Sequence, residues 1–352
     1  MPATPRPATP EPTTRESRSR GVAVVTGGSA GLGRAISREL AARGWDVAVL
    51  ARGEERLAGT VRDIEERGRR GLGISTDVAD REAVERAADR VEDELGPIEL
   101  WVNDAMAGVF GEFLETDPAD FERATAVDYF GFVNGTRAAL SRMVPRDRGH
   151  VIQVGSALGH RSIPLQAAYC GAKHAITGFT DSVHTELGHR GSKVKLSQVD
   201  MPALDTPQFS WVKSALPHHP QPVAPIFAPE VGARAVADVA DRPRRRTWVG
   251  RSTVYTILGS RLSNRAADWY LARTGYSGQQ AKDVDSPMLP PNLYEPAAGD
   301  QGAHGAFRDR EIRHSLQTWA IGHRRLASAG AVVVAAGAAI AGVAALAGGR
   351  SR

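Results

Sequence analysis

Residues 22–33, VAVVTGGSAGLG, join a short apolar run to a glycine-rich turn. The run 22–26 is typical of a strand buried in a parallel sheet. A helical pattern follows over about 34–43, and Gly44 is placed to end it. In this order, the glycines let the backbone approach a phosphate, and the helix N-terminus supplies free N–H groups and a positive dipole end. The stretch therefore predicts a phosphate-binding turn between a strand and a helix.

The same alternation of apolar runs and helical patterns continues for about 200 residues. Further strands are predicted at 46–50, 72–76, 99–102, 151–154, 194–199 and 247–250. Helices are predicted at about 54–67, 81–95, 118–143, 169–189 and 229–240. The pattern predicts an α/β protein with a Rossmann-type doubly wound parallel sheet of about seven strands and helices on both faces. Right-handed crossovers would bring four residues to one edge of this sheet: Gly27, Asn103, Ser156 and Thr206.

Residues 169–173, YCGAK, carry the first candidate for chemistry. On a helix, the four-residue spacing puts Tyr169 and Lys173 on one face. An ammonium beside a phenol favours the phenolate, so we expect the pKa of Tyr169 to lie below its usual value of ~10. Such a tyrosine can exchange a proton with an alcohol or carbonyl, and Ser156 can hold the same substrate oxygen. Because Tyr-x-x-x-Lys pairs are common, this pair alone does not establish a catalytic site.

The residues after the second predicted strand bear on the choice of cofactor. Dinucleotide sites specific for NAD usually place an acid there, on the ribose 2′-hydroxyl. This chain has Ala51 and Arg52 instead. An arginine suits a 2′-phosphate, with Arg34 as a second candidate contact. We therefore predict NADP(H) rather than NAD(H), and the alternative is that Arg52 is merely solvated.

Together these residues resemble the short-chain dehydrogenase/reductase family over about 20–250. The glycine turn matches the family's TGxxxGxG, and Ser156, Tyr169 and Lys173 match its catalytic residues in type and spacing. Asp77 looks like the family's adenine-side acid, and Thr206 resembles the threonine that touches the nicotinamide amide. The resemblance implies cofactor contacts at Gly27, Ser29, Gly31, Leu32, Gly33, Arg52, Asp77, Val78, Asn103, Tyr169, Lys173 and Thr206.

Three positions depart from the family's pattern. The family usually reads Asn-Asn-Ala-Gly where residues 103–106 read Asn-Asp-Ala-Met, in a loop that borders the cofactor. The catalytic asparagine that anchors a relay water in the family corresponds to Asp128, whose carboxylate could still hold a water. Residues 202–206, PALDT, lack the family's glycine after proline and are one residue short.

The resemblance implies hydride transfer between nicotinamide C4 and a carbonyl carbon. Tyr169 would exchange the proton, Ser156 would hydrogen-bond the reacting oxygen, and Lys173 would lower the tyrosine pKa and bind the nicotinamide ribose. We predict an NADP(H)-dependent oxidoreductase of a small carbonyl or alcohol, with Asp128 as a fourth candidate catalytic residue. The alternative is a non-catalytic NADP(H)-binding scaffold or redox sensor. Asp128 and the altered loop favour that alternative, whereas the retained serine argues against it.

Composition limits the other classes of function. The 352 residues are 42% hydrophobic and 24% charged, as in soluble globular proteins, with a net charge of +4. No basic helix interleaved with aromatics occurs, so we expect no nucleic-acid partner. The single cysteine, Cys170, excludes internal disulfides and fits a reducing, cytoplasmic compartment. His218 and His219 lie in a proline-rich loop without supporting ligands, so we expect no metal site. The family resemblance implies a homo-oligomer.

The two ends of the chain lie outside the family pattern. Residues 1–20 are rich in Pro, Thr, Ser and Arg and are expected to form a disordered tail. Residues 251–325 form a C-terminal extension. Within it, one helical segment packed on the core, followed by an irregular wrap, is predicted from Leu258, Leu262 and residues 269–271, WYL.

An uninterrupted run of small apolar residues lies near the C-terminus. It covers 331–347, AVVVAAGAAIAGVAALA. At about 1.5 Å per residue, residues 329–349 are just long enough to cross a ~30 Å hydrocarbon layer. We predict a C-terminal membrane anchor with the enzyme on the cytoplasmic side, which makes an apolar substrate plausible. The alternatives are a disordered tail of alanine and glycine or a helix buried in an oligomer.

Overall fold

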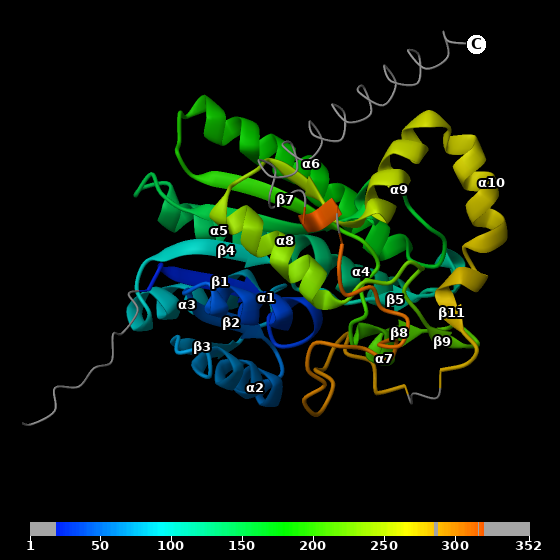
Figure 1. Ribbon diagram of the computed structural model, residues 1–352, viewed down its shortest axis with the longest axis horizontal. Coiled ribbons are helices and arrows are strands. Elements are labelled where there is room, and N and C mark those ends of the chain that lie inside the picture. The colour runs from blue at the N-terminus through cyan, green and yellow to red at the C-terminus, as the bar shows by residue number, and fades with distance from the viewer. Residues whose placement is uncertain (1–18, 285–287, 316, 320–352) are drawn as a thin grey trace, which may run out of the picture.

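A computed structural model describes residues 19–284, 288–315 and 317–319 (Figure 1). At its centre lies a seven-stranded sheet in the order β10-β7-β6-β4-β1-β2-β3, with every neighbouring pair parallel. The strands are β1 Val22–Thr26, β2 Asp46–Ala51, β3 Gly71–Ser75, β4 Ile98–Asn103, β6 His150–Ser156, β7 Lys195–Met201 and β10 Arg246–Trp248. The predicted doubly wound α/β sheet is confirmed.

Helices cover both faces of this sheet and bury its alternating side chains. The helices are α1 Gly31–Ala42, α2 Glu54–Glu65, α3 Arg81–Glu94, α4 Pro118–Thr125, α5 Gly131–Met143, α6 Ala167–His189 and α8 Pro229–Asp241. Val25 of β1 packs into a core shared with α1, α2 and α8. Its neighbour Val24 packs into a second core shared with α3, α4, α5 and α6. The period of two along a strand therefore supplies both cores at once.

The carboxyl ends of the central strands meet at one edge of the sheet. Thr26 at the end of β1 lies opposite Asn103 at the end of β4. Ser156 at the end of β6 lies opposite Met201 at the end of β7. In an open parallel sheet this edge is where ligands bind.

The helical pattern expected over residues 118–143 contains one irregularity. Helices α4 and α5 are joined by a π-helical turn, Ala126–Phe130. Single π turns inside α-helices occur frequently at functional sites. Here the turn carries Asp128, which is almost completely buried.

The C-terminal extension differs from its sequence-based prediction. Two helices form instead of one, α9 Gly250–Leu262 and α10 Asn264–Thr274, because the Ser263 hydroxyl caps the start of α10 by accepting from the Ala266 N–H. The predicted packing on the core is wrong for several side chains. Leu258, Leu262 and Trp269 are 46%, 88% and 60% exposed. Both helices stand to one side of the sheet (Figure 1).

The chain then runs back over the sheet edge as an irregular segment, here named the C-terminal arm and defined as residues 288–315 (orange in Figure 1). Ile312 of the arm forms a parallel bridge with Phe227. Phe307 is fully buried in a third core, together with Phe209 of the short helix α7, Gln208–Trp211. Two small two-stranded sheets support this region: β5 Val109–Phe110 with β8 Lys213–Ser214, and β9 His219–Pro220 with β11 Gln280–Ala281.

Several sequence-based expectations concern the ends of the chain. Most of the tail expected over residues 1–20, and all of the anchor expected over 329–349, lie outside the described residues. Within the described part of the chain, no helix combines the length and the apolar character needed to cross a membrane. The membrane anchor and the homo-oligomer therefore stay predictions.

Candidate active site

A cavity of about 500 Å³ opens along the carboxyl edge of the sheet. Eleven of the residues predicted from the sequence line it: Gly27, Ser29, Gly31, Leu32, Arg52, Asp77, Val78, Ser156, Tyr169, Lys173 and Thr206. The described residues that line the cavity do not include Gly33, Asn103 or Asp128. The cavity therefore joins the glycine turn at one end to the tyrosine and lysine at the other.

The glycine turn is folded tightly against the loop after β4. Gly27 has φ +69°, and a Cβ there would lie 2.6 Å from the Cα of Ala105. A Cβ on Gly33 would lie 2.4 Å from the Gly27 carbonyl oxygen. Both positions therefore require glycine for close backbone approach, which is the role that glycines have in a dinucleotide-binding turn. Gly33 acts through this helix packing and not through the cavity wall.

The start of α1 meets two distant segments. A Cβ on Gly31 would lie 3.3 Å from Thr206, so the loop after β7 is packed directly on the glycine turn. The Gly31 N–H donates to the carbonyl of Gly302, in the C-terminal arm, over 3.0 Å. The N–H group at this helix N-terminus already donates to a carbonyl oxygen, so it is chemically suited to donate to a phosphate oxygen as well.

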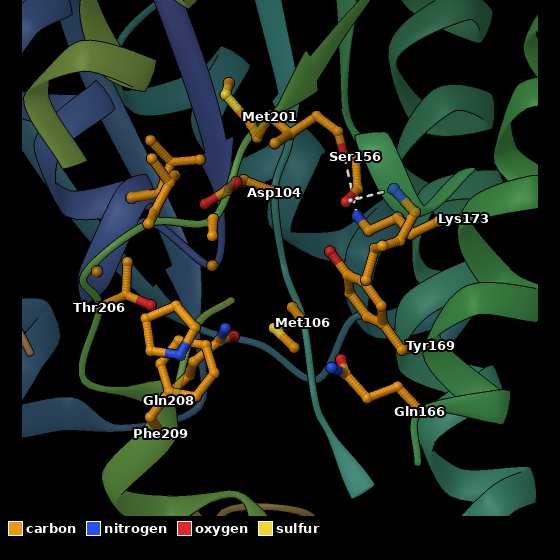
Figure 2. Close-up of a pocket in the computed structure, with 18 of the residues that line it drawn as sticks. Asp104, Met106, Ser156, Gln166, Tyr169, Lys173, Met201, Thr206, Gln208 and Phe209 are labelled. Carbon is orange, nitrogen blue, oxygen red and sulfur yellow. Dashed lines mark hydrogen bonds between the residues drawn. The ribbon is translucent and has the colours of Figure 1, made fainter. Parts of the chain in front are cut away.

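Ser156, Tyr169 and Lys173 gather where β6 ends and α6 begins (Figure 2). The Tyr169 hydroxyl points toward Ser156, and the Lys173 side chain lies beside the tyrosine ring (Figure 2). Lys173 Nζ lies 5.5 Å from the centroid of that ring and donates to the Val154 carbonyl over 2.9 Å. The Ser156 hydroxyl accepts from the Leu158 N–H over 3.1 Å. Strand end and helix therefore hold all three side chains at one point of the cavity.

The protonation of Tyr169 differs from the expectation drawn from its neighbour. Burial raises the pKa of Tyr169 far above its usual range, the Ser156 hydroxyl lowers it, and Asp128 and Asp104 add to the rise. Burial also lowers the pKa of Lys173. The expected lowering of the tyrosine pKa is wrong for this structure, because burial of the phenol raises it and the lysine ammonium donates to the Val154 carbonyl. The buried Tyr169 phenol therefore stays protonated at neutral pH.

Two carboxyl groups, those of Asp128 and Asp104, interact electrostatically with Lys173. Asp128 Oδ1 accepts from the Ala107 N–H over 2.7 Å, while its Oδ2 is buried without a hydrogen-bond partner among the described residues. Burial raises the pKa of Asp128 to about 7, although Lys173 lowers it. Burial likewise raises the pKa of Asp104, which lines the cavity. The lysine therefore shares this buried region with a tyrosine and with two acids whose pKa values burial raises.

Asn103, which was predicted to contact the cofactor, lies beneath the cavity wall. Its side chain is fully buried, donates to Thr136 and Gln153 over 3.1 and 2.9 Å, and accepts from Trp101 over 2.8 Å. A side chain with these contacts links β4, β6 and α5 instead of facing the cavity. Its neighbour Asp104 occupies the cavity wall.

The opposite end of the cavity carries arginines. Arg52 donates to the carbonyls of Leu293 and Tyr294, in the C-terminal arm, over 3.2 and 2.7 Å. Arg56 donates to the carbonyl of Ala297, also in the arm, and lines the cavity beside Arg52. Both arginines keep their positive charge beside neutral oxygens, and Asp77 and Val78 border them.

Arg34 does not reach this group of arginines. Its guanidinium is almost completely buried and is paired with Asp63 over 2.7 Å and with Asp300 of the arm. These two carboxylates neutralise its charge, so the sequence-based idea of a second phosphate contact at Arg34 is not supported. Arg56, and not Arg34, lines the cavity together with Arg52.

Several residues of the cavity wall were not identified from the sequence. Asp104 and Met106 lie in the altered loop, where the departure from the family's pattern was the available indication. Arg56 lies in the first turn of α2, four residues after Arg52, and both side chains line the cavity. Gln166 precedes α6 and is held by Gln279 over 2.6 Å, a contact across 113 residues that no local pattern indicates.

Comparisons with known proteins agree with this geometry. A model of the short chain dehydrogenase family matches residues 21–215. The uncharacterized oxidoreductase YxnA of Bacillus subtilis (strain 168) is 30% identical over 294 residues, which cover 82% of this chain and 83% of that protein.

Two solved structures show the same architecture. An alcohol dehydrogenase from the archaeon Thermococcus sibiricus, complexed with 5-hydroxy-NADP, is 25% identical with a TM-score of 0.58, covering 65% of this chain and 95% of its own. A short chain dehydrogenase/reductase from Burkholderia phymatum, in complex with NAD, has a TM-score of 0.62 at 22% identity and covers 72% and 95%. The second likeness concerns the fold alone.

Proposed function

The chain belongs to the short chain dehydrogenase family of oxidoreductases, and we propose that it transfers hydride between NADP(H) and a carbonyl/alcohol pair, with Tyr169 as general acid and base. One observation carries this proposal. Ser156, Tyr169 and Lys173 line the same cavity as the glycine turn and Thr206, so that a cofactor on the turn would end beside the tyrosine. The nicotinamide supplies the hydride chemistry when it is bound.

The protein's own residues supply the proton and hold the reacting oxygen. Burial keeps the proton on the Tyr169 hydroxyl, which can donate it to the oxygen that becomes negative during reduction. Ser156 lies beside that hydroxyl and can hydrogen-bond the same oxygen. Lys173 interacts with both Tyr169 and Asp128, and a water held by Asp128 Oδ2 would complete a route for replacing the proton.

NADP(H) is favoured over NAD(H) by the charges at the other end of the cavity. No acid stands directly after β2, where Arg52 and Gly53 follow and where NAD-specific sites usually place an acid. Arg52 and Arg56 line this end, and neither forms an ion pair with any described residue. A 2′-phosphate would therefore meet two guanidinium groups whose charge is not already neutralised by a salt bridge.

The substrate end of the cavity favours an apolar carbonyl compound or alcohol. Ile163, Phe209, Val223 and Leu271 line it, and Gln166, Gln208 and Gln221 add amide groups. Apolar walls with a few polar groups fix the orientation of a ligand without a requirement for charge. We infer an uncharged ketone, aldehyde or alcohol with a hydrocarbon portion.

The test is the absorbance of reduced nicotinamide, followed with purified protein, NADPH and a panel of apolar ketones and aldehydes. We expect turnover that falls by about 10²- to 10⁴-fold in Tyr169→Phe, while NADPH binding stays within a few-fold. Tyr255→Phe, at an exposed tyrosine of α9, is the matched control and should retain full activity. Tight NADPH binding without turnover of any carbonyl, or of any alcohol with NADP⁺, would instead support the scaffold or redox sensor.

A further inference from the structure

Three potential metal ligands meet away from the cavity's catalytic end. Asp205 follows β7, whereas His304 and Glu311 belong to the C-terminal arm. One ligand atom from each residue lies within 4.8 Å of the other two. We propose that these three side chains bind a divalent first-row transition-metal ion, for which Zn²⁺ is the best-fitting probe, and that this ion fastens the arm to the loop after β7.

One carboxylate oxygen of Asp205 is buried without a hydrogen-bond partner among the described residues. The residue is fully buried, and its Oδ1 accepts from the Phe307 N–H over 3.1 Å. Its Oδ2 is buried and has no hydrogen-bond partner among the described residues. A buried carboxylate oxygen left without a partner is costly, so the arrangement indicates a missing cation or donor.

His304 has the geometry of a metal-ligating histidine with its supporting carboxylate. Its Nε2 lies 2.9 Å from Oε1 of Glu230, at the start of α8. Its Nδ1 lies 3.3 Å from Oε2 of Glu311. Metal-bound histidines commonly donate the other ring N–H to a carboxylate, which fixes the tautomer and leaves the ligating nitrogen deprotonated. Glu230 would be that acceptor, and Nδ1 the ligand.

The spacing of the two arm ligands also suits a small ion. Two ligands that each lie about 2.0–2.1 Å from a tetrahedral zinc ion are separated by roughly 3.4 Å. The observed separation of His304 Nδ1 and Glu311 Oε2 is 3.3 Å, which is long for a charge-assisted hydrogen bond. The arm therefore holds these atoms near the distance that a shared metal ion requires.

The local charge favours a cation as well. Asp205, Glu230 and Glu311 surround the single imidazole, and Arg313 pairs with the outer oxygen of Glu311 over 3.0 Å. The Glu311 side chain is only 1% exposed, so water compensates little of its charge. One imidazole with two carboxylates is a donor set that suits zinc better than magnesium or calcium, which prefer oxygen alone. His304 is 19% exposed, which gives an ion a path from solvent.

A metal at this place would be structural. The neighbour of Asp205 is Thr206, which packs on Gly31 of the glycine turn. The main-chain carbonyl of Asp205 also accepts from the Gly305 N–H over 3.3 Å, so arm and loop already touch. An ion bound by both segments would hold the arm against the wall of the cofactor cavity.

The experiment uses the full chain, with any affinity tag removed and its metals stripped by EDTA. Calorimetric titration with ZnCl₂ and elemental analysis of the reconstituted protein are expected to give about one zinc per chain. His304→Ala and Glu311→Gln should each weaken zinc binding by at least about 100-fold. Glu230→Gln, which changes the supporting carboxylate, should weaken it by about 10- to 100-fold. The double variant His218→Ala/His219→Ala, which removes the paired histidines of the loop, should bind zinc as the wild type does.

Three results would overturn the proposal, and the first two concern zinc binding by the variants. One is a wild-type protein that binds no more zinc than His304→Ala. The other is a loss of binding in the His218→Ala/His219→Ala control, which would move the site to that loop. Circular dichroism distinguishes a variant that has lost a metal ligand from one that has unfolded. If the other variants unfold, Glu230→Gln still tests the proposal, because the Glu230 side chain is 41% exposed and its substitution should not disturb the fold. Mg²⁺ or Ca²⁺ binding in place of Zn²⁺ would also contradict the assignment.

Discussion

The two ends of the cavity are built in different ways. At the catalytic end, Ser156 is the last residue of β6, Lys173 lies in the second turn of α6, and Asp128 lies in the π turn before α5. At the opposite end, Arg52 follows β2 but is held by carbonyls of the C-terminal arm, about 240 residues further along the chain. The first end is built by the sheet and its flanking helices, and the second is completed by a segment that returns to it.

Because the two ends are built differently, we expect them to contribute to different steps: the catalytic end to the reaction, and the arm end to cofactor binding. Groups fixed by strand ends and helices are preorganised, which is what a proton donor beside a developing charge requires. Groups held by an irregular arm can shift with that arm without disturbing the sheet. Changes at the catalytic end should therefore alter the rate, whereas changes at the arm end should alter the affinity for the cofactor.

The largest effect is expected at Lys173. Lys173→Met removes the ammonium that lowers the pKa of both Asp104 and Asp128 and that lies beside Tyr169. We expect the rate of hydride transfer, measured in single turnovers with saturating NADPH, to fall by about 10²- to 10⁴-fold. Lys195→Met, at an exposed lysine of β7, should leave the rate unchanged. A fall of less than tenfold in a folded Lys173→Met protein would remove the lysine from the proposed proton route.

A smaller effect, confined to one cofactor, is expected at the arm end. Arg52→Ala should raise the Kd for NADPH by about 10- to 100-fold and leave the Kd for NADH within about twofold, because a charged hydrogen bond to the 2′-phosphate contributes roughly 1.5–3 kcal/mol. Fluorescence titration of both reduced cofactors measures this. Arg90→Ala on the exposed face of α3 is the control. Equal changes for the two cofactors would mean that Arg52 only holds the arm, and the preference for NADP(H) would then fail.

The sheet and the catalytic residues could be predicted because their patterns are local. A buried strand followed by a glycine turn and a helix is readable within 12 residues, and the spacing of Tyr169 and Lys173 lies within one helical turn. The contacts of the arm are not readable in this way. Arg34 was expected to face a phosphate, but Asp300, which is 266 residues away, neutralises it.

Besides the contacts of the arm, the degree of burial of individual side chains could not be predicted from the sequence. The pKa of Tyr169 was expected to fall because of Lys173, yet desolvation outweighs the lysine once the whole cavity encloses the phenol. Similarly, Leu262 and Trp269 match a buried helical pattern but project from helices beside the sheet. Asp205, His304 and Glu311 come together only because the arm returns to the loop after β7.

The smallest effect is expected on stability, at Asp128. Its pKa in the folded protein, about 7, lies above its usual value of about 3.8. Between these two pH values the folded protein keeps a proton that the unfolded chain releases, so the free energy of unfolding should fall as the pH rises through this window. Asp128→Asn removes the titration and retains an oxygen for the Ala107 N–H. Its stability relative to wild type should therefore grow by about 2 kcal/mol from pH 5.5 to 7.5.

Urea denaturation at the two pH values measures this difference, with Asp93→Asn, at an exposed aspartate of α3, as the matched control. The control and the wild type should show the same dependence on pH. Identical pH dependence in Asp128→Asn and wild type would place the charge of Asp128 in solvent contact and remove it from the buried group around Lys173. A pH-dependent gain in stability together with a loss of turnover would show that this buried carboxyl destabilises the fold while it serves the catalytic end of the cavity.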